Sequence, residues 1–274
     1  MRNRLLSFIV LWGSVLGVLW FFRAPGALVI ITLLSALTLR EFYELLRAAG
    51  HQPIVGAGVT LGALITAAPW IEPICPAAHY IVPVCVAAVA CMVLAHPPEN
   101  RVDTLGSTLF GLLYVSAMLA FLVKIVRPFP GDVVQPDGRL ILGLWLIAVT
   151  KFCDVGALLS GMAFGRHKMA PVISPKKTWE GAIGGVLISA GLGALIAWLC
   201  RDSFPAHFTP TFAALAAVPV AVIGVVSDLI ESVIKRRANR KDSGNTIPGI
   251  GGVFDLTDSL ILTAPIGFLL FGLD

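Results

Sequence analysis

The sequence predicts an all-α, polytopic integral membrane protein with about nine transmembrane helices. Its 274 residues are 57% hydrophobic and only 13% charged, and the mean hydropathy of +0.88 lies far from that of a soluble domain. Apolar runs of roughly 17 to 25 residues, each long enough to cross ~30 Å of hydrocarbon as a helix, recur along the chain.

Nine apolar ranges are the candidate spans. They lie at about 5–22, 25–40, 54–71, 79–96, 105–124, 139–163, 180–200, 211–227 and 256–273. The first range has no small-x-small cleavage site before the next apolar run, so we expect a retained signal-anchor helix. No internal repeat is visible, which disfavours a solenoid and an inverted-repeat transporter.

The basic residues predict the orientation. With the N-terminus inside, fourteen of the 20 fall in cytoplasmic segments: Arg2, Arg4, Arg40, Arg47, Arg101, Arg166, Lys168, Lys176, Lys177, Lys235, Arg236, Arg237, Arg240 and Lys241. Five fall in outer segments, and Lys151 falls within a span. The positive-inside rule therefore places the N-terminus in the cytoplasm and the C-terminus outside. It also explains the basic pI of about 8.9 without a nucleic-acid partner.

The five cysteines are scattered through apolar segments, without a C-x-x-C pair. This usage indicates small buried hydrophobes rather than a disulfide framework or a zinc site.

The polar residues divide the chain into two regions. Region 1–138 holds about five helices with short loops and little beyond Gly, Ala, Leu and Val. Region 139–274 holds the polar density, including two basic cytoplasmic loops, and is expected to be catalytic.

Lys151 and Asp154 lie inside the sixth predicted span. Ionisable side chains at membrane depth cost several kcal/mol unless they are paired or face a polar cavity, and a spacing of three places both on one helix face. They form either a self-neutralising ion pair or part of a polar cavity.

The loop 165–181 gathers side chains that could hold phosphate oxygens, together with backbone N–H groups at the start of the following helix. The candidate residues are Arg166, Ser174, Lys176, Lys177 and Thr178. The alternative is an ordinary cytoplasmic loop in which Trp179 is an interfacial anchor.

Asp228 stands where the eighth span leaves the membrane. With Ser232, Lys235 and Asn239 it is spaced by three or four residues, so one helix face would offer an acid, a hydroxyl, a cation and an amide. A polar helix end entering water is the simpler alternative.

The run Pro248–Gly252 predicts a tight turn that leads into the ninth span. It delivers Asp255 and Asp258 to one face of the first helical turn. One carboxylate at a helix N-terminus is commonplace, but two, with Asp228 nearby, could bind Mg²⁺ together with substrate phosphates. The sequence thus combines acids that could bind a metal, cations in two loops and a glycine turn. These groups could together neutralise the charge that develops on phosphate in a transfer reaction.

Twelve residues near the C-terminus follow one spaced pattern: Ser232, Lys235, Arg236, Lys241, Asp242, Gly244, Ile247, Pro248, Gly251, Gly252, Asp255 and Asp258. The pattern resembles the signature of the phosphatidate cytidylyltransferases, or CDP-diacylglycerol synthases. Asp154, the Gly165–Arg166 pair, the run 174–181 and Asp228 also match elements of that family. The similarity covers roughly residues 140 to 262.

Two positions depart from the family pattern. Ile250 stands where the family has histidine, and Leu256 stands where it has arginine. At these two positions the chain therefore lacks the imidazole and the guanidinium of the family, which can bind phosphate or assist proton transfer.

The resemblance implies that CTP and phosphatidate are converted to CDP-diacylglycerol and pyrophosphate with Mg²⁺. It implies catalytic roles for Asp228, Lys235, Arg236, Lys241, Asp242, Asp255 and Asp258, with Asp228, Asp255 and Asp258 as metal ligands. It implies substrate binding by Asp154, Arg166, Ser174, Lys176, Lys177, Thr178, Ser232, Gly251 and Gly252. It also suggests a homodimer. The compactness of the chain suggests a bacterial inner membrane, and the basic loops predict an active site that faces the cytoplasm.

Two alternatives stay open at this point. One is a CTP-dependent enzyme that acts on another lipid phosphate or a lipid alcohol. The other, motivated by Ile250 and Leu256, is a lipid-binding homologue that has lost catalysis.

Overall fold

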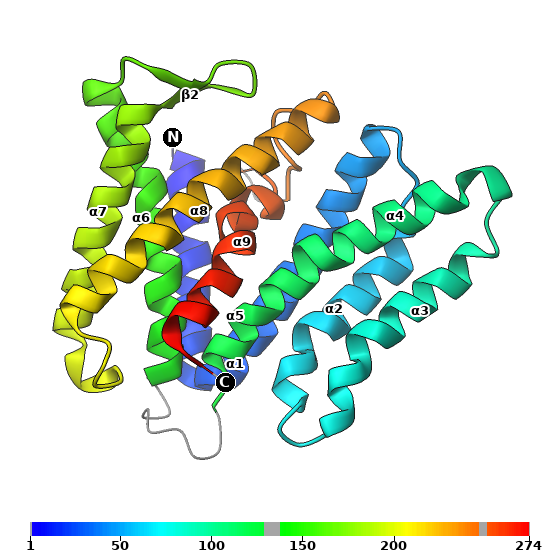
Figure 1. Cartoon of the computed structure of the whole chain (residues 1–274), viewed down its shortest axis with the longest axis horizontal. Helices are drawn as coiled ribbons and strands as arrows, with labels where there is room; N and C mark the ends of the chain where they lie inside the picture. Colours follow the sequence, from blue (N-terminus) through cyan, green and yellow to red (C-terminus); the bar gives the residue numbers. More distant parts are fainter. Residues whose placement is uncertain (1, 129–137, 247–250, 274) are drawn as a thin grey trace. The chain divides into compact units, whose positions relative to one another are not determined.

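The computed structural model describes residues 2–128, 138–246 and 251–273, with side chains from residue 12 onward. The all-α, polytopic membrane architecture is confirmed, since the described chain is built from helices apart from one short hairpin (Figure 1). Among the described residues, 7 helical segments are long and apolar enough to cross a membrane.

The difference between seven segments and the nine predicted ranges arises at the N-terminal end. Helix α1 (Arg2–Ala48) runs through the first two ranges, and α2 (Val55–Ile71) has only 17 residues. Within α1 the backbone is kinked at Arg23, whose φ is 47°. Pro25 lies two residues further on and favours a break here, because proline lacks the amide donor and its ring clashes with the carbonyl four residues earlier in a helix.

The chain folds into two compact units that are not contiguous in sequence. Unit 1 comprises Met1–Arg127 and Ile234–Thr257, and unit 2 comprises Pro128–Val233 and Asp258–Asp274. The boundaries fall within α8 (Pro210–Arg237) and within α9 (Val253–Phe271). Segment 234–257 thus belongs to the same compact unit as the N-terminal helices. The assignment of catalysis to region 139–274 stays a prediction.

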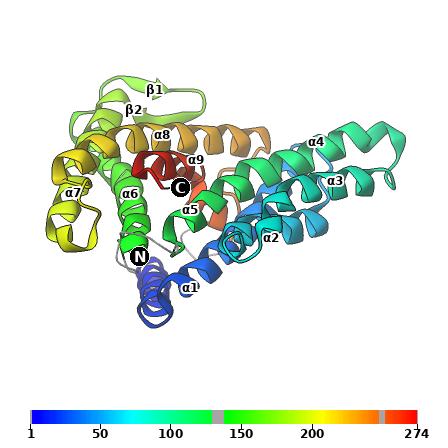
Figure 2. The ribbon, with the colours of Figure 1, turned by 60° about the horizontal axis from the view of Figure 1, so that its bottom comes forward.

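Unit 1 contains α1, α2, η1 (Pro76–Tyr80), α3 (Ile81–Val93), η2 (Pro98–Asn100), α4 (Arg101–Gly111), the π-helical stretch η3 (Leu112–Ala117) and α5 (Met118–Val126). Helices α2, α3 and α4 lie side by side in both views (Figures 1 and 2). The fully buried Tyr43 anchors α1, and its hydroxyl donates to the carbonyl of Thr108 at 2.8 Å. Gly58 and Gly111 face this ring, and neither has space for a Cβ atom.

Unit 2 begins with α6 (Gly138–Phe164), which is joined to α7 (Trp179–Leu199) by an antiparallel hairpin of β1 (Lys168–Ala170) and β2 (Ser174–Thr178). The hairpin lies at the end of these two helices (Figures 1 and 2). The turn η4 (Arg201–Ser203) leads to α8, and the part of α9 from Asp258 onward completes the unit.

Small residues allow α6 and α7 to pack closely. Every fourth residue of α7 is buried and small, namely Gly181, Gly185, Ser189, Gly193 and Ala197. A Cβ at Gly185 would lie 2.6 Å from the carbonyl oxygen of Cys153 on α6. Such stripes bring helix backbones together in membranes, where apolar burial gives little preference for helix contact over lipid contact.

Candidate functional site

Unit 2 contains a cluster of three acidic side chains, here called the acidic cluster. Asp228 and Glu231 lie one turn apart on α8, and Asp258 lies on α9. One carboxylate oxygen from each residue lies within 4.8 Å of the other two. Glu231 is 2% exposed and Asp258 7% exposed, so the cluster is largely shielded from solvent. Three carboxylates this close repel one another unless cations balance them.

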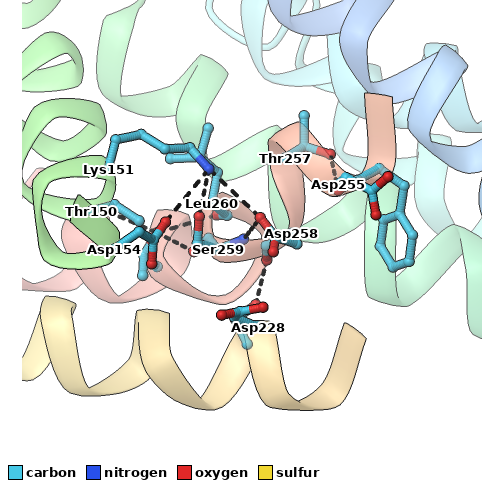
Figure 3. Close-up of polar contacts among 12 residues, drawn as sticks. Thr150, Lys151, Asp154, Asp228, Asp255, Thr257, Asp258, Ser259 and Leu260 are labelled. Carbon is cyan, nitrogen blue, oxygen red and sulfur yellow. Dashed lines mark hydrogen bonds and ion pairs between the residues drawn. The ribbon is translucent and has the colours of Figure 1, made fainter. Parts of the chain in front are cut away.

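Lys151 reaches the acidic cluster from α6. Its ammonium nitrogen lies 2.7 Å from Ser259 Oγ, 3.6 Å from Asp258 Oδ1 and 4.0 Å from Asp154 Oδ2. Figure 3 shows these side chains converging from α6 and α9, with Asp228 approaching from α8. The contacts with Ser259 and Asp258 show that Lys151 is more than the partner of Asp154 in a local ion pair.

A pocket of about 200 Å³ opens beside the acidic cluster within unit 2. Its polar lining comes from α6, β2 and α8: Asp154, Lys176, Lys177, Thr178 and Asp228. Its apolar lining includes Leu158, Met169 and Val225. Lys177 forms an ion pair with Asp228 across the pocket wall. The structure therefore brings together five candidate residues from three separate parts of the sequence: Asp154, the loop 165–181 and Asp228.

The hairpin carries the other residues proposed from loop 165–181. Thr178 is the N-cap of α7, and its hydroxyl accepts the Gly181 amide at 3.2 Å. Glu180 accepts the Arg166 amide at 3.1 Å and lies 2.5 Å from His167 Nδ1. The Arg166 side chain is exposed, and Ser174 is half-buried in β2.

Asp255 belongs to unit 1, where a salt bridge and two amides occupy its carboxylate. Lys235 Nζ lies 2.8 Å from Asp255 Oδ1, and the Gly252 and Ser243 amides donate to Oδ2 at 2.9 and 3.0 Å. Gly251 has a φ of +133°, and a Cβ there would lie 2.7 Å from Asp255 Oδ2. Of the three proposed metal ligands, Asp228 and Asp258 thus lie in the acidic cluster, whereas the contacts of Asp255 described here lie within unit 1.

The remaining proposed residues are placed as follows. Arg236, Lys241 and Asp242 are exposed, and Ser232 is half-buried on α8. Helix α8 ends at Arg237, so Asn239 follows it in a left-handed conformation with φ 54° and does not extend the helix face. Pro248, Gly249 and Ile250, from the predicted turn, lie outside the described residues.

Comparison with known proteins decides the family. The cytidylyltransferase family model matches residues 2–273. The chain belongs to the cytidylyltransferase family. It is 30% identical over 267 residues to a phosphatidate cytidylyltransferase from Synechocystis sp., covering 90% of this chain and 87% of that relative.

Two further relatives of the chain are also phosphatidate cytidylyltransferases by name. A phosphatidate cytidylyltransferase from Rickettsia bellii is 36% identical over 171 residues, covering 60% of this chain and 74% of the relative. The chloroplastic phosphatidate cytidylyltransferase 5 of Arabidopsis thaliana is 34% identical over 281 residues, covering 93% of this chain and 67% of the relative. The family resemblance inferred from the residues is confirmed.

Two acids in the structure are not among the site residues predicted from the sequence. Glu231 follows Asp228 by three residues on the helix, a spacing that could have drawn attention to it. Glu41 directly follows the predicted span 25–40. In the structure it lies within α1 and is 4% exposed, and a buried acid in an apolar helix is itself a signal of function.

Proposed function

We propose that the protein is a phosphatidate cytidylyltransferase, which transfers CMP from CTP to phosphatidate and releases pyrophosphate. The observation that carries the proposal is the acidic cluster beside a lysine-lined pocket, in a chain that matches the cytidylyltransferase family from end to end. The names of relatives that cover most of the chain support phosphatidate as the acceptor.

The acidic cluster fits a divalent cation. It brings one carboxylate oxygen from each of three residues within 4.8 Å of the other two, and Lys151 and Lys177 lie at its edge as partners of Asp258 and Asp228. Carboxylate oxygens are the protein ligands that Mg²⁺ prefers, usually one or two together with substrate phosphates. We propose Asp228, Asp258 and Glu231 as the residues that hold Mg²⁺, with Glu231 added to the set proposed from the sequence.

The reaction needs little acid–base chemistry from the protein. The second pKa of a phosphomonoester is about 6, so phosphatidate at neutral pH is largely dianionic and its oxygen can attack the α-phosphorus of CTP directly. The new P–O bond forms as the bond to the β-phosphate breaks, and pyrophosphate leaves with the negative charge. Bound Mg²⁺ would stabilise that charge. Positioning and charge neutralisation are the main contributions of the side chains.

The pocket suits the phosphate end of a lipid. Its volume of about 200 Å³ is below the ~300–1,000 Å³ of sites that enclose a whole drug-sized ligand, so it fits a phosphate group rather than a complete nucleotide. Lys176 and Lys177 offer charge-assisted hydrogen bonds to phosphate, while Leu158, Met169 and Val225 offer apolar surface to the adjoining glycerol and acyl carbons.

We propose Lys235, with Arg236 and Lys241, for the phosphates of CTP. Lys235 forms a salt bridge with Asp255 at 2.8 Å. Because basic residues dominate loop 165–181 and segment 235–241, we also place both on the cytoplasmic side, where CTP is available.

The direct test uses purified protein with radiolabelled CTP, phosphatidate and Mg²⁺. We expect a labelled CDP-lipid and equimolar pyrophosphate from the wild type, and loss of product in Asp228→Asn and Asp258→Asn. Asp202→Asn is the matched control, because its side chain is 95% exposed on η4. Well-folded protein that forms no CDP-lipid from phosphatidates of several acyl lengths would overturn the proposal.

The same assay with a total lipid extract separates the alternatives. Mass analysis that finds CMP on another lipid phosphate, or phosphate on a lipid alcohol, would identify a different acceptor. Turnover that persists in Asp228→Asn and Asp258→Asn would argue against the site.

A further inference from the structure

Glu41 of α1 is buried in unit 1, where it binds the segments on either side of residues 247–250. Its exposed fraction is 4%. One carboxylate oxygen, Oε2, accepts the Ser243 hydroxyl at 2.9 Å and the Phe254 amide at 2.9 Å. The other, Oε1, accepts the Thr246 hydroxyl at 2.5 Å. Residues more than 200 positions away along the chain are thus held by one side chain of the N-terminal helix.

Glycines make this arrangement possible. A Cβ at Gly252 would overlap both Ser243 Oγ and Glu41 Oε2, and a Cβ at Gly244 would lie 2.9 Å from Glu41 Oε1. The backbone can therefore close around the carboxylate only because both positions lack a side chain. Three donors from the two segments converge on the two oxygens of Glu41, so one side chain holds both segments by hydrogen bonds.

The contacts continue from Glu41 to the proposed phosphate-binding residues. Ser243 donates its hydroxyl to Glu41 and its amide to Asp255 Oδ2, at 2.9 and 3.0 Å. Asp255 in turn holds the ammonium of Lys235 at 2.8 Å. Within unit 1, one series of contacts links Glu41 to Lys235 through Ser243 and Asp255.

We propose that Glu41 is a positioning residue for nucleotide binding, which acts through Ser243 and Asp255 to fix the orientation of Lys235. This inference rests on the proposed function, because Lys235 is assigned there to the phosphates of CTP. Glu41 itself touches no reacting atom, so its removal should weaken CTP binding rather than the interaction with the lipid.

Three variants and one control test the proposal. In Glu41→Ala all three contacts are lost, and we expect the KM for CTP to rise by about tenfold or more, with the KM for phosphatidate unchanged.

In Glu41→Gln the amide oxygen can accept from Ser243 and Phe254 while its NH₂ donates to the Thr246 oxygen, so we expect activity within about threefold of wild type. Ser243→Ala should repeat the effect of Glu41→Ala on CTP. The control is Glu44→Gln, on the same helix, whose side chain is 43% exposed and pairs with Arg40.

Hydrogen exchange provides a readout that does not depend on turnover. The Phe254 amide should exchange faster in Glu41→Ala than in wild type or Glu44→Gln, because it loses its acceptor. Unchanged exchange at Phe254 would overturn the positioning role whatever the enzyme does. Faster exchange with an unchanged KM for CTP would also overturn the proposal, since the loop would then be held without effect on nucleotide binding. Absence of cytidylyltransferase activity in the wild type would instead refute the proposed function and leave the exchange result standing.

Discussion

At the scale of single residues, the carboxylates of the two units have distinct surroundings. Asp255 is surrounded by an ammonium group and two backbone amides, which together satisfy a negative charge. Asp228, Glu231 and Asp258 lie close together, and Lys151 and Lys177 offset part of their mutual repulsion. Carboxylates therefore organise a backbone segment in unit 1 and form the proposed metal site in unit 2.

Glu231→Gln tests the metal site. Changes to residues that only support metal ligands already cost about 10- to 100-fold in affinity, so loss of this charge should raise the Mg²⁺ concentration for half-maximal activity by about tenfold or more. The measurement is a Mg²⁺ titration of activity, together with the Mg²⁺-induced rise in melting temperature. Glu99→Gln, an exposed acid on η2, should behave as wild type. Equal titrations for both variants would remove Glu231 from the ligand set.

Gly252→Ala tests the packing around Glu41. The added methyl group would overlap Ser243 Oγ and Glu41 Oε2, and overpacking of this kind costs about 1–3 kcal/mol. We expect a lower melting temperature in detergent and a loss of activity. Gly106→Ala on α4 is the control, since a Cβ there meets nothing within 4 Å. A Gly252→Ala variant as stable as the control would contradict the described geometry.

At the scale of elements, the contact between α6 and α7 positions the pocket. Asp154 and Leu158 come from α6, while Gly181 and Ala182 come from the first turn of α7. The hydroxyl of Ser189 donates to the Val149 carbonyl at 2.5 Å, and the Trp145 indole donates to the Gly193 carbonyl at 2.9 Å. These bonds fix the register of the two helices, because each one joins a side chain of one helix to a backbone carbonyl at the same level of the other helix.

Gly185→Val should separate these helices. Its side chain would meet the Cys153 carbonyl and the Ala157 methyl group on α6, so we expect a destabilisation of about 1–3 kcal/mol and weaker phosphatidate binding. Gly191→Val on the same helix is matched in chemistry but meets nothing within 4 Å. Thermal unfolding and the KM for phosphatidate provide the comparison. Similar losses in both variants would indicate an effect of valine in the helix rather than of the contact.

At the scale of the whole molecule, the charge asymmetry of the loops determines the expected orientation. Loop 165–181 and segment 235–241 hold nine lysines and arginines, namely Arg166, Lys168, Lys176, Lys177, Lys235, Arg236, Arg237, Arg240 and Lys241. The connection that contains η4 holds Arg201 alone. Loops rich in lysine and arginine tend to stay on the cytoplasmic side during membrane insertion.

Cysteine labelling tests this orientation. In a background without the five native cysteines, Val172→Cys in the hairpin should react with an impermeant maleimide only after cells are opened. Asp202→Cys on η4 should react in intact cells. Both side chains are almost fully exposed, at 92% and 95%, so access is decided by the side of the membrane. The reverse pattern would invert the predicted topology.

The all-helical membrane architecture and the family could be predicted from the sequence alone. Helix length and apolarity are properties of continuous segments, so each of the nine predicted ranges overlaps a helix or, at 105–124, the continuous α4–η3–α5 helical stretch. The sequence motifs also predicted five of the residues that line the pocket in unit 2: Asp154, Lys176, Lys177, Thr178 and Asp228.

Only the tertiary structure decided which charged groups meet. Glu231 joins Asp228 and Asp258 because the packing of α8 and α9 in unit 2 brings their faces together. Glu41 reaches Ser243 and Phe254 because segment 234–257 folds back onto the N-terminal helices. Local patterns carry no information on contacts between positions so far apart in the chain. For this protein the sequence by itself therefore determined the class and the family, and packing determined the partner of each buried carboxylate.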